Sequence, residues 1–138
     1  QYCIYFYIWA CKNIKKGMAV LNDSYLVGKI VEVNFTTSRV LLLSDINSKI
    51  PISIEPGSLQ SILSGDGDDM GIVQYSKKNV SLKIDSIVYT SGAGGLFKSG
   101  IPIGKITKSV LNSKNNVEFF SDFSQLRFVN VALFEQVN

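Results

Sequence analysis

Residues 90–104 have the spacing most suited to chemistry, the run Thr-Ser-Gly-Ala-Gly-Gly-Leu-Phe-Lys-Ser-Gly-Ile-Pro-Ile-Gly. This glycine segment holds five of the 11 glycines and one of the three prolines, and strand-like apolar runs flank it. Glycines at this density can surround a phosphate, form an oxyanion hole or turn a corner between strands. The residues that would shape such a corner are Gly92, Gly94, Gly95, Gly100, Pro102 and Gly104.

The segment fits neither common nucleotide-binding motif. A P-loop needs glycine directly before its lysine, so that backbone N–H groups can approach the phosphates. Lys98-Ser99 would be the Lys-Ser pair, but Phe97 stands at the required glycine position. The dinucleotide fingerprint fails as well, because the run from Gly92 to Phe97 lacks its last glycine. We therefore expect no nucleotide and no other cofactor.

Ser91 is the candidate nucleophile if the segment serves acyl transfer. The chain contains no histidine, so the usual general base is missing. A Ser-Lys arrangement with Lys98 or Lys105 stays open. We expect a non-catalytic protein, and the alternatives are a two-lobed β-hydrolase of atypical Ser or Ser-Lys type and a small-ligand-binding β-barrel.

Metal binding has little support in the sequence. Cys3 and Cys11 are the only cysteines, and without histidine their spacing matches no zinc motif. Asp66, Asp68 and Asp69 share a glycine-containing loop, but the EF-hand pattern and its terminal glutamate are absent. A solvated turn is the expected role of this loop, and we expect no metal.

Composition limits the remaining classes. The 138 residues are 46% hydrophobic and 18% charged, which suits one domain or two small lobes with a real core. A net charge of +3 with scattered lysines gives no basic stripe, so nucleic acid is not an expected partner.

The chain opens at Gln1, and we expect a fragment or a processed form. The apolar run 4–10 is too short to cross a bilayer and predicts a strand.

Short apolar runs alternate with turn clusters along the whole chain, which predicts an all-β fold. The one short stretch with helical character is 58–64. The predicted strands are 17–21, 26–35, 40–43, 50–54, 71–75, 86–90, 101–108, 117–120 and 126–134.

The chain contains an internal repeat. Val-Gly-Lys-Ile at 27–30 recurs as Ile-Gly-Lys-Ile at 103–106, and the Ser-Asp pair at 44–45 recurs at 121–122 after an apolar run in both copies. The repeat predicts two small six-stranded-type β-barrels or sandwiches packed on each other. Their approximate units are 12–57 and 78–138, with a connecting segment 58–77, and strands from one unit can interleave with the other.

The glycine segment also carries a family resemblance. With the stretches 16–23, 26–31 and 41–51, it resembles the rod shape-determining protein MreC family over about residues 13–134. The family often has proline after the signature phenylalanine, where this chain has Lys98. Residues 2–11 align poorly with the family pattern.

The resemblance implies a non-enzymatic scaffold of the machinery that elongates the peptidoglycan wall. It implies a single-pass protein of the bacterial inner membrane whose upstream helix is absent here, this chain being the β region on the periplasmic face. The implied partners are MreD, a class B penicillin-binding protein, other elongation proteins and further copies of the chain, as a dimer or filament. Exposed apolar residues would form the contact surface, and the first candidates are Leu96, Phe97, Tyr25 and Leu26.

Overall fold

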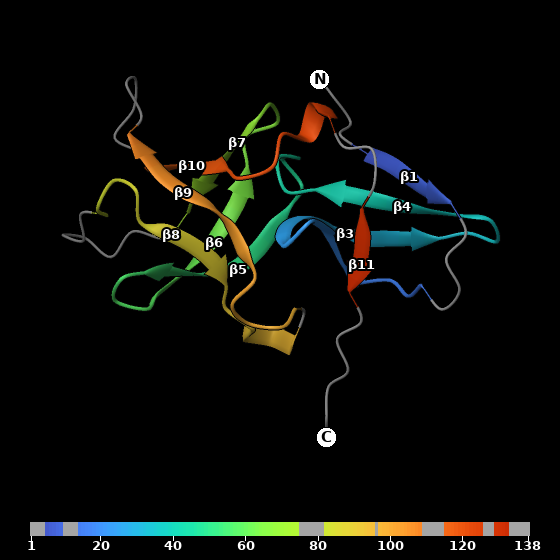
Figure 1. Ribbon diagram of the computed structural model, residues 1–138, viewed down its shortest axis with the longest axis horizontal. Coiled ribbons are helices and arrows are strands. Elements are labelled where there is room, and N and C mark those ends of the chain that lie inside the picture. Colours follow the sequence, from blue (N-terminus) through green and yellow to red (C-terminus); the bar gives the residue numbers. More distant parts are fainter. Residues whose placement is uncertain are drawn as a thin grey trace.

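The computed structural model describes residues 5–9, 14–74, 82–95, 97–108, 115–125 and 129–132. The described residues form 11 strands and two short 3-10 turns, and the predicted all-β class is confirmed. The strands divide into a closed barrel, at the left of Figure 1, and an open sheet, at the right. Cys3, Cys11 and Leu96 lie outside the described residues.

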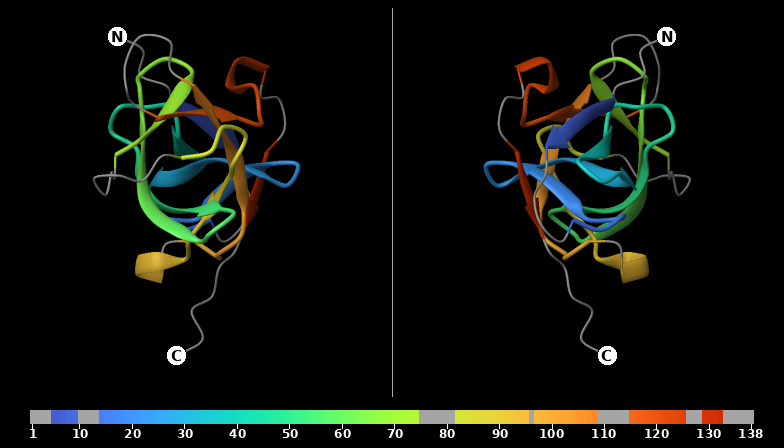
Figure 2. Two further views of the ribbon diagram at one scale, coloured as in Figure 1. Left: turned by 90° about the vertical axis from the view of Figure 1, so that its left-hand side faces the viewer. Right: turned by 90° about the vertical axis from the view of Figure 1, so that its right-hand side faces the viewer.

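The barrel contains six antiparallel strands in the order β10-β7-β6-β5-β8-β9. Figure 2 shows how they curve around a common interior. In β5 the buried residues Ile50, Ile52 and Ile54 alternate with less buried ones, because successive side chains of a strand point to opposite faces. The strand bounds are β5 Lys49–Glu55, β6 Leu59–Gly65, β7 Met70–Val73, β8 Ile87–Thr90, β9 Pro102–Lys108 and β10 Asn115–Phe119.

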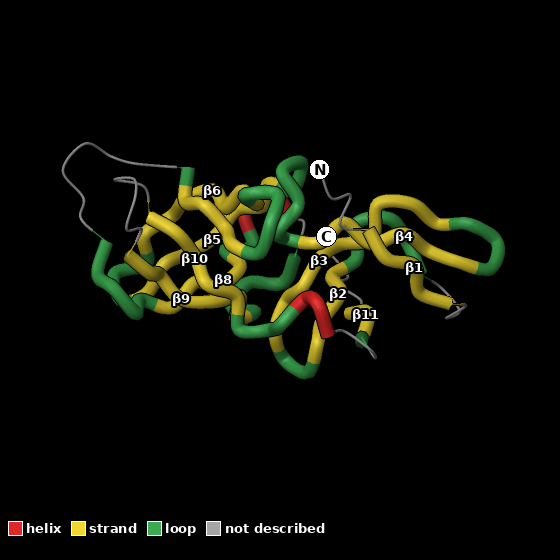
Figure 3. The backbone as a smooth tube through the Cα atoms, turned by 90° about the horizontal axis from the view of Figure 1, so that it is seen from above, coloured by secondary structure: helices red, strands yellow, loops and turns green. Residues whose placement is uncertain are grey.

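The second sheet has five antiparallel strands in the order β1-β4-β3-β2-β11 and does not close. Figure 3 shows it extending away from the barrel as a separate lobe. Strand β11 comes from the end of the chain and pairs with β2, while β5 continues from the first half of the chain into the barrel. The bounds are β1 Tyr5–Trp9, β2 Ala19–Asn22, β3 Tyr25–Val33, β4 Thr37–Leu42 and β11 Asn130–Ala132.

The stretch 58–64, whose sequence has some helical character, forms strand β6 instead. Its residues pair with β5 on one side and β7 on the other, and Ser61 and Leu63 face inward on either side of the exposed Ile62. A two-residue alternation therefore outweighs the weak helical character of the stretch. The helical elements described are the 3-10 turns η1 Ala93–Gly95 and η2 Phe123–Gln125. Within the described residues, no helix has the length and apolar character needed to span a bilayer.

The two lobes share part of their core. Ala19 and Leu26 belong to the open sheet, yet they pack in the same apolar cluster as the barrel residues. The open sheet also has an apolar cluster to which the described residues of the barrel strands contribute no buried side chain. It consists of Val20, Val27, Ile30, Val40 and Leu42. Phe123 of η2 packs against both clusters, so it connects the two lobes.

Matching positions of the sequence repeat occupy equivalent places in the two sheets. Val20 pairs with Gly28 in the open sheet, Val88 pairs with Gly104 in the barrel, and each pairing changes register directly after the valine. A Cβ atom at Gly28 would collide with the Leu41 carbonyl, and one at Gly104 with the Glu118 carbonyl. Close approach of the neighbouring strand thus requires glycine at both positions. The unit boundaries 12–57 and 78–138 stay a prediction.

Candidate protein-interaction surface

The glycine segment forms the long connection between β8 and β9, and Thr90 holds it in shape. The Thr90 hydroxyl donates to the Lys98 carbonyl at 2.6 Å and accepts from the Ile101 N–H at 3.0 Å. Gly92, Gly94, Gly95 and Gly100 have positive φ angles, which glycine adopts without the strain that a Cβ atom causes. This part of the segment is a structural corner.

Phe97 lies inside this corner and not on its surface. Its side chain is 2% exposed and packs in the barrel's apolar cluster. The expectation that Phe97 is an exposed contact residue is therefore wrong. The chain reverses around the glycines, and the phenylalanine fills the barrel end beneath them. Leu96, the neighbouring candidate, lies outside the described residues.

Leu26 is also a core residue, with 0% of its surface exposed. It follows the β2–β3 turn and packs into the shared cluster between the lobes. The expectation that Leu26 is exposed is wrong, because the contact between the two lobes buries an apolar residue that a free turn would expose.

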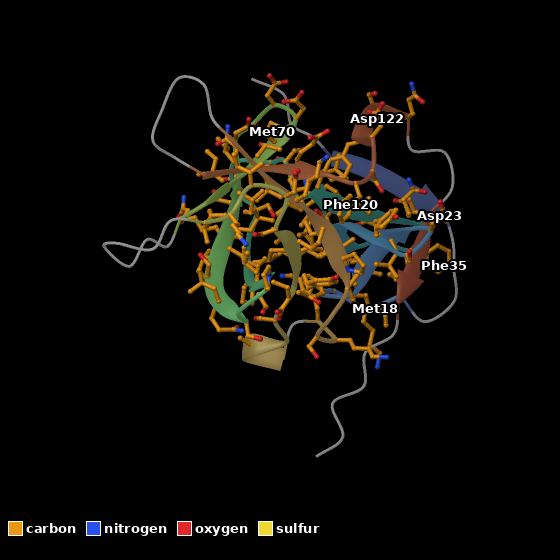
Figure 4. The ribbon with its side chains drawn as sticks, turned by 60° about the vertical axis from the view of Figure 1, so that its left-hand side comes forward. Met18, Asp23, Phe35, Met70, Phe120 and Asp122 are labelled. Atoms are coloured by element: carbon orange, nitrogen blue, oxygen red, sulfur yellow. The ribbon has the colours of Figure 1, made fainter. Side chains whose placement is uncertain are left out.

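Tyr25, the remaining candidate, lies at the surface where the lobes meet. Its ring centroid is 5.1 Å from that of Phe120, with a tilt of 43° between the rings. Phe120 directly follows β10 of the barrel and is 36% exposed. Beside the rings, the Asn22 amide donates to the Ser121 hydroxyl at 3.4 Å. We call these four residues, Asn22, Tyr25, Phe120 and the largely buried Ser121, the junction surface; Figure 4 labels Phe120 to the left of Asp23 and below Asp122.

Asp122 organises the turn that follows the junction surface. Its carboxylate accepts from the Ser124 hydroxyl at 2.6 Å and from the Ser124 N–H at 3.0 Å. The Ser124 hydroxyl, followed by its N–H, holds the pKa of the Asp122 carboxyl below its ordinary value. The turn places the Phe123 ring 4.8 Å from that of Phe119, in a stacked arrangement. The Asp122 turn therefore supports the aromatic contacts beneath the junction surface.

Phe120 is the functional candidate that the sequence reading missed. Strand alternation could have found it, since Val117 and Phe119 face inward while Glu118 and Phe120 face outward. Leu43 occupies the equivalent position in the first copy of the sequence repeat, directly before Ser44, and it is buried in the shared core. The exposure of Phe120 is thus a difference between two otherwise equivalent positions.

The residues considered for catalysis serve the local turn structure. The Ser91 hydroxyl accepts from the Ala93 N–H at 3.1 Å, and Lys98 is exposed. In the acidic loop, the Asp66 carboxylate accepts from the N–H groups of Asp68 and Met70 at 2.8 and 3.2 Å. Across the described residues, no three His, Cys, Asp or Glu side chains gather in a way that would hold a metal ion.

The barrel interior is filled with apolar side chains. Strands β5 to β10 supply Ile52, Ile54, Leu63, Val88, Ile103, Ile106, Val117 and Phe119, and the corner supplies Phe97. Such packing stabilises a fold through burial. The fold and the junction surface together define a two-lobed all-β domain with an aromatic pair where its lobes meet.

The chain belongs to the family described as "Rod shape-determining protein MreC, barrel core", which residues 10–133 match. The Caulobacter vibrioides cell shape-determining protein MreC is 36% identical over 124 residues, which cover 90% of this chain and 36% of that protein. The chain thus spans about a third of the length of that relative. The predicted family is confirmed.

Solved structures share the fold. A crystal structure of MreC from Pseudomonas aeruginosa aligns with a TM-score of 0.85 and 25% identity, over 95% of this chain and 90% of that one. The complex between penicillin-binding protein PBP2 and MreC from Helicobacter pylori contains a chain that aligns with a TM-score of 0.73. That alignment has 15% identity, covers 94% of this chain and 86% of the other, and establishes likeness of fold.

Proposed function

We propose that this chain is a non-catalytic scaffold domain of the cell-wall elongation machinery, and that it maintains bacterial cell shape by binding peptidoglycan-synthesis proteins. It acts on the periplasmic face of the inner membrane, to which a helix upstream of this region anchors it. The family membership supports this role. The principal partner is a class B penicillin-binding protein, in keeping with the complex formed by the Helicobacter pylori relative. MreD and other elongation proteins are further partners.

The proposed protein-binding site is assigned from one observation. The exposed Phe120 ring lies against the half-buried Tyr25 ring, and the two come from different lobes. Aromatic side chains that are partly exposed on a rigid scaffold are frequent anchors of protein interfaces. The Asn22–Ser121 hydrogen bond beside them adds polar groups at the edge of the same site. The junction surface is therefore the proposed contact for the penicillin-binding protein.

A binding titration with the class B penicillin-binding protein of the same cell tests this site. Phe120→Asp should weaken binding by tenfold or more, because truncation of an interface anchor typically costs about 2 kcal/mol or more. Phe120 is already 36% exposed, so the fold should persist, and circular dichroism checks this. Ile62→Asp is the matched control, since Ile62 is a similarly exposed apolar residue on β6 of the barrel. Equal affinity of the Phe120→Asp variant and the parent chain would reject the site.

Self-association is the second proposed contact, through the open sheet. Strands β1 and β11 lie at its two edges, whereas the barrel closes on itself. A free strand edge offers unpaired backbone N–H and C=O groups to another strand. Tyr7→Lys, in the middle of β1, should lower the association constant measured by sedimentation, since charge on an edge strand opposes pairing. Ile62→Lys on the closed barrel is the control, and equal effects of the two variants would argue against the edge.

A further inference from the structure

The hairpin that joins β3 to β4 has an apolar apex. Phe35 is fully exposed at 103%, and Val33 beside it is 44% exposed. The Asn34 N–H donates to the Thr37 carbonyl at 2.7 Å and closes the turn. We call residues 33–36 the distal tip, because it lies at the end of the open sheet that is farthest from the barrel (Figure 1). Figure 4 labels Phe35 at the margin of the molecule.

Positive charge lies beside the distal half of β3, the strand that leads to the distal tip. The turn that leads into β2 carries the exposed side chains of Lys15 and Lys16. The Gly17 N–H donates to the Ile30 carbonyl at 2.7 Å, which fixes this turn beside the distal half of β3. Among the described residues of this end, the acidic Glu32 is neutralised by Arg39 at 2.8 Å. The two lysines therefore determine the sign of the local charge.

The distal tip and the junction surface lie at opposite ends of one strand. Tyr25 begins β3 and Val33 ends it, a run of nine residues. An extended strand rises about 3.3 Å per residue, so these ends are roughly 25 Å apart. A surface that contacts the tip therefore leaves the junction surface free.

We propose that the distal tip inserts Phe35 into the headgroup region of an anionic lipid bilayer, with Lys15 and Lys16 against the lipid phosphates. A convex tip with one protruding aromatic ring needs no complementary groove in a bilayer, and the neighbouring positive charge favours anionic lipid. The contact rests on the proposed membrane anchor, which would hold the distal tip close to a bilayer. It would orient the domain so that the barrel and the junction surface face away from the membrane.

Co-sedimentation of this 138-residue chain with lipid vesicles tests the proposal. The vesicles are either phosphatidylcholine alone or equal parts of phosphatidylcholine and phosphatidylglycerol. Phe35→Ser should lower partitioning into anionic vesicles about tenfold, from the lost burial of one aromatic side chain. Lys15→Gln with Lys16→Gln should lower it about fivefold for each charge removed, and should leave neutral vesicles unaffected. Ile84→Ser, at a 55% exposed apolar residue before β8, should change nothing.

The outcomes separate this contact from the proposed function. Loss of vesicle binding in Phe35→Ser, with unchanged affinity for the penicillin-binding protein, supports the membrane contact. Unchanged vesicle binding in Phe35→Ser overturns it, and a loss of protein affinity in the same variant would then identify the tip as a protein contact. Phe120→Asp should leave vesicle binding unchanged, so a failure of the junction site appears in the protein titration alone.

Discussion

At the scale of single residues, Phe97 is the side chain that the glycine segment places in the core of the barrel. The glycines around it allow the chain to reverse, and the reversal places an aromatic ring at 2% exposure inside the barrel. Phe97→Ala should lower the free energy of unfolding by about 3–5 kcal/mol, the usual cost of emptying a buried aromatic site. Chemical denaturation measures this difference.

Phe35→Ala is the matched control for that measurement. Phe35 is fully exposed, so its truncation should change stability by no more than about 0.5 kcal/mol. If the two substitutions cost the same, Phe97 does not fill the barrel as described.

The second prediction at the scale of single residues concerns the pKa of Asp122 and its effect on stability. Because Ser124 donates two hydrogen bonds to its carboxylate, the pKa of Asp122 should lie below 3.8, the ordinary value. A lowered folded-state pKa means that the ionised carboxylate contributes stability above the unfolded value, and that this contribution is lost as the pH falls through the folded one. A side-chain NMR titration reads the midpoint. Ser124→Ala should raise it, and an unchanged midpoint would contradict the assigned cause.

The strands themselves were largely predictable at the scale of elements. Alternating apolar residues identified most strands, and the repeat of Gly-Lys-Ile and Ser-Asp placed Gly28 and Gly104 at positions that prove equivalent. The stretch that forms β6 has some helical character in the sequence, because a seven-residue run offers little periodicity to compare. Leu26 and Phe97 are buried although they are apolar residues near turns, because a sequence does not reveal which turn ends are covered by another lobe or by the barrel end.

Gly104 tests the strand contact that the repeat encodes. Gly104→Ala places a methyl group against the Glu118 carbonyl of β10, so β9 and β10 must separate. The expected loss of stability is about 1–3 kcal/mol, typical of overpacking. Thermal unfolding measures it, with Lys105→Ala on the same strand as the control. A neutral Gly104→Ala would show that the two strands are not so closely packed.

The contact between the lobes matters most at the scale of the whole molecule. Ala19 and Leu26 join the barrel's core, Phe123 packs on both clusters, and Tyr25 meets Phe120 above them. The lobes are therefore held in one relative position by buried apolar groups. A surface made from both lobes can keep its shape only if this packing persists, which links the stability of the fold to the proposed scaffold role.

Hydrogen exchange of the chain, measured with and without the class B penicillin-binding protein, tests whether the junction surface is the binding site. Backbone N–H groups that a partner covers exchange more slowly than in the free chain. We predict that protection on binding concentrates in two segments distant in sequence, around 22–25 and 119–124. Protection confined to the barrel strands β6 and β7, with both junction segments unchanged, would contradict it.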